Sequence, residues 1–157
     1  MGPRPSHPLP TPLRRPCSVF ILDSRATSHV VGDVSLFSPS FRSRTPTTTA
    51  GSPAAAYQAH DGRVLTVAGV GTVSCDNHRV AYARCVPDLC TGLNLVSVQQ
   101  LADCGYLVMF GGGQCSVMEQ SSGKITGKGR LHADDSLYHL EFLDIPHDKT
   151  CEDSTPT

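Results

Sequence analysis

Short apolar runs separated by turn residues dominate residues 17–143. Cys17–Asp23 (CSVFILD) is rich in apolar and β-branched residues and has the length of a buried strand. Asp61-Gly62 is a two-residue turn signal between Ala54–His60 and Arg63–Ala68, which predicts a β-hairpin. The other strand candidates flank further turns: Gly71–Cys75, Arg79–Val86, Tyr106–Phe110, Gln114–Glu119, Lys124–Lys128 and Ser136–Phe142. This spacing predicts an all-β fold, a small closed or partly closed β-barrel.

One segment has a helical period. Leu95–Asp103 (LVSVQQLAD) repeats its apolar residues along one face, and Gly105 stands just beyond its end, where helices commonly stop. We therefore expect one short helix near residues 95–103. Asp33 has the side chain of an N-cap and predicts one further turn at Val34–Phe37.

The two ends of the chain differ from its middle. Residues 1–16 contain six of the twelve prolines, and a proline ring fixes φ and removes a backbone donor. We expect a disordered Pro-rich leader over residues 1–16, a folded β-barrel domain over 17–143, and a polar flexible tail over 144–157.

Composition excludes several classes of function. Thirteen basic and fourteen acidic residues give a net charge of −1, so the chain lacks the basic surplus that binds nucleic acid by itself. Tryptophan is absent and aromatic residues make up 6%, which disfavours a stacking platform. No apolar run is long enough to span a membrane, and no signal peptide is recognisable. The expected location is therefore intracellular, in the cytoplasm.

Seven cysteines are scattered through the chain, an odd number that favours free, buried thiols in a reducing compartment over a disulfide framework. Cys85, Cys90, Cys104 and Cys115 lack the Cys-x₂-Cys spacing of zinc sites. We therefore expect no metal and no other cofactor.

The residues after the first apolar run could carry chemistry. Asp23 ends that run, and the small hydroxyl residues Ser24, Thr27 and Ser28 follow it. Two carboxylates that share a proton can hydrolyse a peptide bond, since one activates water while the other protonates the substrate. No second segment of this kind occurs, so an active site would need two chains related by a two-fold axis. Taken alone, these residue types favour an ordinary strand-end turn.

A family resemblance favours the catalytic interpretation. Five segments, in order, resemble the protease region of copia-type (Tnt-like) retrotransposon Pol polyproteins. They are Asp23–Val30 (DSRATSHV), Gly32–Phe37 (GDVSLF), His60–Val73, Val86–Leu101 (with VPDL and NLVSVQQL), and Cys115–Leu140 (with SGKITGKG and LYHL). No single segment is specific, but their order is, and the resemblance covers about residues 18–142.

The resemblance implies a retropepsin-like β-barrel that acts as a homodimeric aspartic protease on Gag-Pol polyprotein peptides, without a cofactor. Each protomer would contribute one catalytic aspartate, Asp23. The active-site loop would contain Ser24, which grips the opposite loop, followed by Arg25, Ala26 and Thr27. The region 62–71 would lie in or near the hairpin that covers the substrate, and His29 would be structural.

Arg25 departs from the family, which has glycine at this position. Glycine suits two loops that approach closely, and a side chain there would intrude. If the side chain faces Asp23, an arginine within about 4–6 Å of a carboxylate also lowers its pKa by roughly 1–3 units, which would remove the proton that the two aspartates share. If it faces solvent instead, only the steric and backbone cost remains. We therefore expect a catalytically degenerate protease domain. The alternatives are a non-enzymatic β-barrel module for structure or interaction, and a genomic relic of such an element.

Overall fold

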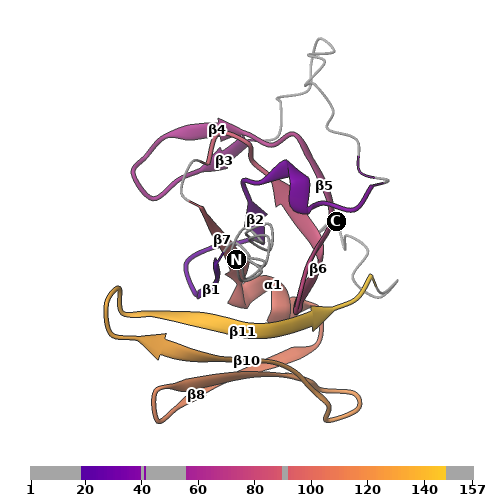
Figure 1. Ribbon diagram of the computed structural model, residues 1–157, viewed down its shortest axis with the longest axis vertical. Coiled ribbons are helices and arrows are strands. Elements are labelled where there is room, and N and C mark those ends of the chain that lie inside the picture. The colour runs from indigo at the N-terminus through magenta and orange to yellow at the C-terminus, as the bar shows by residue number, and fades with distance from the viewer. Residues whose placement is uncertain (1–18, 40, 42–55, 90–91, 148–157) are drawn as a thin grey trace, which may run out of the picture.

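The computed structural model describes residues 19–39, 41, 56–89 and 92–147 (Figure 1). The predicted leader, and the tail beyond residue 147, lie outside the described residues. The described chain is all-β apart from one α-helix and one 3₁₀ turn. Its elements are β1 Val19–Asp23, β2 Val30–Val31, the 3₁₀ turn Val34–Leu36, β3 Ala56–Gln58, β4 Val64–Thr66, β5 Gly69–Cys75, β6 His78–Cys85, β7 Leu93–Ser97, α1 Val98–Asp103, β8 Tyr106–Gly111, β9 Gln114–Glu119, β10 Ile125–His132 and β11 Leu137–Ile145.

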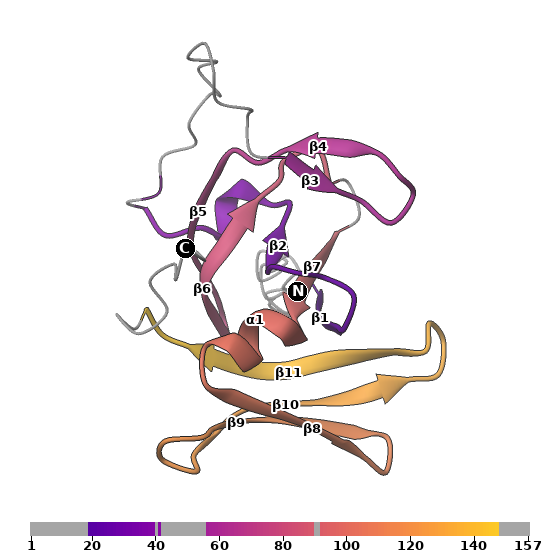
Figure 2. The ribbon, with the colours of Figure 1, turned by 180° about the vertical axis from the view of Figure 1, so that it is seen from behind.

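Nine strands form one sheet in the order β5-β6-β2-β7-β1-β11-β10-β9-β8, and a further pairing between β6 and β11 closes part of it into a ring. The β3–β4 hairpin is a separate two-stranded sheet. Figures 1 and 2 show this hairpin at one end of the molecule and the β8–β10 layer at the other, with the ring between them.

Strand β1 occupies the centre of the sheet, as its apolar run predicts. It pairs in parallel with β7 and antiparallel with β11. Phe20, Ile21 and Leu22 are all buried, because the strand has neighbours on both edges and side chains packed on both faces. The expected strand is therefore confirmed over the residues of Cys17–Asp23 that the structure describes.

The predicted helix begins three residues later than expected. Residues 93–97 form β7, which pairs with β1 in register from Leu93 opposite Val19 to Ser97 opposite Asp23. The helix then runs over Val98–Asp103, and the Ser97 hydroxyl accepts the Gln100 backbone N–H at 3.0 Å as its N-cap. Pairing with β1 outweighs the helical period of residues 95–97, and the N-cap at Ser97 fixes the point at which the helix begins.

Three other local predictions can be compared with the structure. Asp33 caps the 3₁₀ turn by accepting the Ser35 N–H, as predicted. The hairpin around Asp61 is present, but its loop is longer than two residues, since the Ala59 N–H donates to Arg63 across it. Strand β11 continues to Ile145, beyond the predicted domain end at 143, because residues 143–145 pair with β6.

Two apolar clusters hold these elements together. The larger fills the ring and the space beneath α1, with Phe20, Leu101 and Leu143 among its fully buried members. The smaller lies under the β3–β4 hairpin, where Ala59 and Leu65 pack with Val30, Val86 and Leu89. The hairpin is therefore anchored at its base by apolar contacts.

The cysteines only partly follow the expectation of free thiols. Cys85 and Cys115 are free and buried, and Cys104 is half-buried and forms no disulfide bond. Burial raises the pKa of the Cys115 thiol to about 11, so this group is a core residue and not a nucleophile. Cys75, in contrast, is disulfide-bonded.

Strand β10 bends where small residues let its neighbours approach. A bulge lies between Lys128 and Gly129 in the pairing with β11. A Cβ atom at Gly129 would lie 2.3 Å from the His139 carbonyl oxygen and 2.9 Å from the Cys115 sulfur. Backbone, unlike the end of a long side chain, cannot easily move aside, so glycine is required at this position.

We predict that Gly129→Ala lowers the free energy of unfolding by about 2 kcal/mol, the usual cost of overpacking. Gly111→Ala is the matched control, because a Cβ at Gly111 meets nothing within 4 Å and its φ is not positive. Chemical denaturation of both variants checks this. Equal destabilisation of the two variants would contradict the close approach.

Candidate functional site

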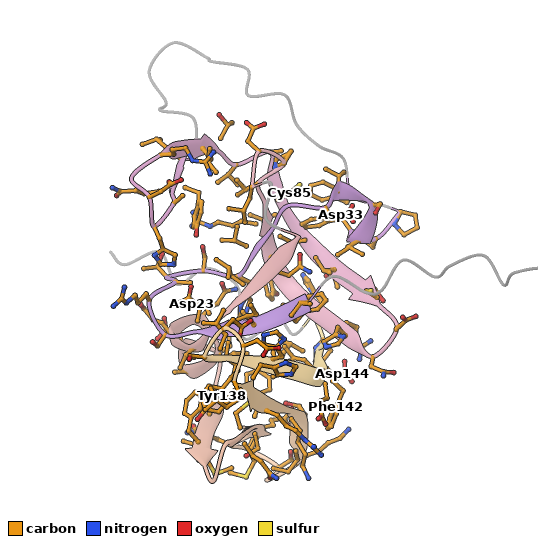
Figure 3. All side chains as sticks on the ribbon, turned by 60° about the vertical axis from the view of Figure 1, so that its left-hand side comes forward. Asp23, Asp33, Cys85, Tyr138, Phe142 and Asp144 are labelled. Carbon is orange, nitrogen blue, oxygen red and sulfur yellow. The ribbon has the colours of Figure 1, made fainter. Side chains whose placement is uncertain are left out.

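Asp23 ends β1 with its carboxylate held by its own loop. Oδ1 accepts the backbone N–H of Arg25 at 2.8 Å and that of Ala26 at 3.3 Å. These two bonds turn one carboxylate oxygen into the loop and leave Oδ2 directed outward. The side chain is 15% exposed, which makes it accessible without being fully solvated. Figure 3 shows it between the β3–β4 end of the molecule and Tyr138.

Ser97 holds the loop that follows Asp23. Its hydroxyl donates to the Ala26 carbonyl at 2.6 Å, and its backbone N–H donates to His29 Nδ1 at 2.8 Å. Ser97 itself is fully buried at the end of β7, directly opposite Asp23 in the register. One residue therefore supports both ends of the segment Ala26–His29.

Gln100 gives the same loop a second anchor. Its Oε1 accepts the His29 backbone N–H at 2.7 Å, and its Nε2 donates to the Tyr82 carbonyl at 3.1 Å. The side-chain amide thus bridges the Asp23 loop and β6 from the first turn of α1. Sequence reasoning overlooked it, although Ser97-x-x-Gln100 has the spacing of a capping box and could have marked the helix start.

His29 is a structural residue in this network, as expected. Its ring is buried, and because Nδ1 accepts a hydrogen bond, the proton of the neutral ring lies on Nε2. Burial lowers the pKa of His29 to about 3, because the apolar surroundings disfavour the charged ring. The loop that carries Asp23 is thus built on a histidine that must stay neutral.

The tip of the β3–β4 hairpin reaches Asp23. His60 Nε2 lies 3.1 Å from the outward oxygen Oδ2, so an N–H at Nε2 donates to the carboxylate. Burial and the charge of Asp23 raise the pKa of Tyr57, on β3, because both disfavour the phenolate. This hairpin contains residues 62–66 of the region 62–71 that was expected in or near a substrate-covering hairpin, but the contact with Asp23 comes from His60, outside that region. His60 was not singled out in advance, and its contact spans 37 positions of sequence.

A cavity of about 640 Å³ opens beside this pair. Apolar and aromatic side chains form much of its wall, including Leu95, Phe110 and Tyr138. The rings of Phe110 and Tyr138 meet edge to face, with centroids 4.8 Å apart. Asp23 is the one carboxylate among the described residues that line the cavity, and Ser24, Arg25 and His60 also border it. The size and lining are typical of a site for an apolar ligand or peptide segment.

Arg25 is exposed and borders the same cavity as Asp23. Its backbone N–H donates to Asp23, but the ion-pair partner of Asp23 among the described residues is His60 and not Arg25. Arg25 is also not among the residues with positive φ. The backbone conformation at this position therefore does not by itself require glycine.

The remaining predicted loop residues have different surroundings. Ser24 is exposed at the cavity, Ala26 is buried under the loop, and Thr27 is exposed. No group of three or more His, Cys, Asp or Glu side chains in the described ranges is arranged to hold a metal ion. The α-helix in the described part of the chain, six residues long, is too short to cross a membrane.

Comparisons of the chain with protein families, with curated proteins and with solved structures found no match. The arguments for function therefore depend on the site itself.

The buried His29 predicts a loss of stability in acid. Its pKa is about 3 in the folded protein and near 6.5 in the unfolded chain, so the unfolded chain binds the extra proton as the pH falls below 6.5. The loss is absent at pH 7.5, reaches about 2 kcal/mol at pH 5, and grows until the folded pKa is passed.

We predict that His29→Asn, which keeps an acceptor for the Ser97 N–H but cannot titrate, flattens the decline in unfolding free energy between pH 7.5 and 5. Gln99→Asn, at an exposed position without a titrating group, should leave the slope unchanged. Denaturation curves at several pH values test this. His78, whose pKa burial also lowers, contributes equally to all three proteins. A slope unaltered by His29→Asn would contradict the assignment.

Proposed function

We propose that this chain is a retropepsin-like aspartic protease domain, derived from a copia-type retrotransposon Pol polyprotein and catalytically impaired by Arg25. The main support is Asp23: a carboxylate at a strand end, held by two loop amides, beside a cavity and beneath a hairpin. The ring of strands around it would correspond to the family's β-barrel.

The proposed reaction requires two copies of the chain. One Asp23 carboxylate would take a proton from a water molecule, whose oxygen then attacks the peptide carbonyl carbon. The other Asp23, protonated, would give its proton to the carbonyl oxygen. Collapse of the tetrahedral intermediate would break the C–N bond, with a proton passing to the amine. A second chain is needed because Asp23 is the one carboxylate that lines the described cavity.

Arg25 would act at the dimer axis. It follows Asp23 by two positions and borders the cavity with an exposed side chain. Two such side chains, one from each copy, would crowd the approach of the two loops and place positive charge near both carboxylates. Both effects oppose a protonated dyad, so we expect little turnover from the chain as it stands.

A non-enzymatic module is the second candidate, favoured by one observation. The outward oxygen of Asp23 already contacts His60 of the same chain, so in this arrangement it is not free for a water molecule or a substrate. In that case the fold would serve in structure or interaction, and Asp23 would only fasten the hairpin.

The decisive experiment measures cleavage of a fluorogenic peptide library between pH 4 and 7. We expect weak or no cleavage by the unaltered chain and at least tenfold faster cleavage by Arg25→Gly, because the steric and electrostatic obstacles are removed. Adding Asp23→Asn to Arg25→Gly should abolish the gain. Asp88→Asn in the same background is the matched control, since Asp88 is exposed and does not line the cavity.

Sedimentation of Arg25→Gly should show a dimer at the concentrations that cleave. Absence of cleavage by every variant, together with a monomer throughout, would reject the protease and support the non-enzymatic module. Cleavage that survives Asp23→Asn would point to a contaminant or to another site.

A further inference from the structure

We infer that His60 caps the outward oxygen of Asp23 and holds the β3–β4 hairpin in a closed, self-inhibiting position. As a statement about catalysis this depends on the proposed function, but the cap itself can be tested without any activity. The contact that carries it is the 3.1 Å approach of His60 Nε2 to Asp23 Oδ2.

The geometry of Asp23 leaves one oxygen for outside partners. Oδ1 already accepts two backbone N–H groups from its own loop, so a water molecule or peptide can best approach at Oδ2. His60 occupies that oxygen. A ligand that uses Asp23 as a proton acceptor or donor therefore competes with the imidazole at this oxygen.

The hairpin has a buried base and a solvent-exposed tip. Ala59 and Leu65 are buried at the base, in the smaller apolar cluster. The tip is solvent-exposed: the His60 side chain is 57% exposed, and Gly62 has a φ of +87° that suits a tight turn. Because the imidazole end of the pair is solvent-exposed, we expect the contact to add little to the free energy of folding and to break without unfolding the base of the hairpin.

The charged neighbours at the tip do not provide an alternative cap. Arg63 donates through Nε to Asp61 at 2.6 Å, and the two form their own ion pair within the turn. Arg25 borders the cavity but is not the ion-pair partner of Asp23 among the described residues. Removal of His60 alone should therefore free the carboxylate.

The test measures how fast a water-soluble carbodiimide couples glycinamide to Asp23 in the full chain, by peptide mapping with mass spectrometry. Asp88, an exposed carboxylate away from the cavity, serves as the internal reference. His60→Asn shortens the side chain so that it cannot reach Oδ2, whereas His60→Gln keeps an N–H donor near the Nε2 position. Arg63→Ala is the control within the same turn.

We expect His60→Asn to raise the Asp23 rate, relative to Asp88, at least threefold, while His60→Gln and Arg63→Ala stay near the unaltered chain. Equal Asp23 rates in all four proteins would overturn the cap. An equal rise in His60→Asn and Arg63→Ala would also overturn it, because the effect would then belong to the turn as a whole.

The outcome separates the cap from the protease. Faster labelling of His60→Asn with no cleavage by any Arg25→Gly protein would keep the cap and reject the enzyme. If Arg25→Gly cleaves peptides and His60→Asn is neither labelled faster nor cleaves faster, the protease proposal is supported and the cap is rejected.

Discussion

Ser97 joins three parts of the molecule through its own atoms. Its backbone lies in β7 beside β1, and its hydroxyl both caps α1 and donates to the Ala26 carbonyl. Its backbone N–H donates to Nδ1 of His29. The shape of the Asp23 loop depends on these bonds, because Ala26 and His29 are the points at which the loop is fixed to the strands. Loss of the hydroxyl would remove the N-cap of α1 and the hydrogen bond to the Ala26 carbonyl together. The free energy of unfolding would fall by the amount typical of a lost cap and a lost buried hydrogen bond.

Local signals in the sequence predict a good part of the fold. The run Cys17–Asp23, the turn residues around Asp61 and the acidic cap at Asp33 each specify structure through their immediate neighbours. Strand β7 escaped prediction because residues 95–97 also continue a helical stripe. Their extended shape follows from pairing with β1, which is distant in the sequence.

The candidate site divides in the same way. Asp23 was recognisable from its position after an apolar run, together with the resemblance to a protease family. His60 and Gln100 were not recognisable from the sequence. Each contributes to the site through a hydrogen bond to the Asp23 loop, which is distant along the chain. The orientation of the Arg25 side chain was likewise open, since the sequence allows it to face either Asp23 or solvent. In the structure Arg25 is exposed and the ion-pair partner of Asp23 among the described residues is His60.

The pairing of β11 has a consequence for how this chain reaches its fold. Strand β11 lies near the end of the described residues, yet it pairs with β1 near their beginning and with β6 near their middle. The ring therefore cannot close until nearly the whole domain has left the ribosome, and until then β1 has one edge without its partner. Contacts between such distant segments make folding slow and leave apolar strand edges exposed during synthesis. The surroundings of the Asp23 carboxylate are therefore assembled late, because β1 obtains its second neighbour only when β11 has been made.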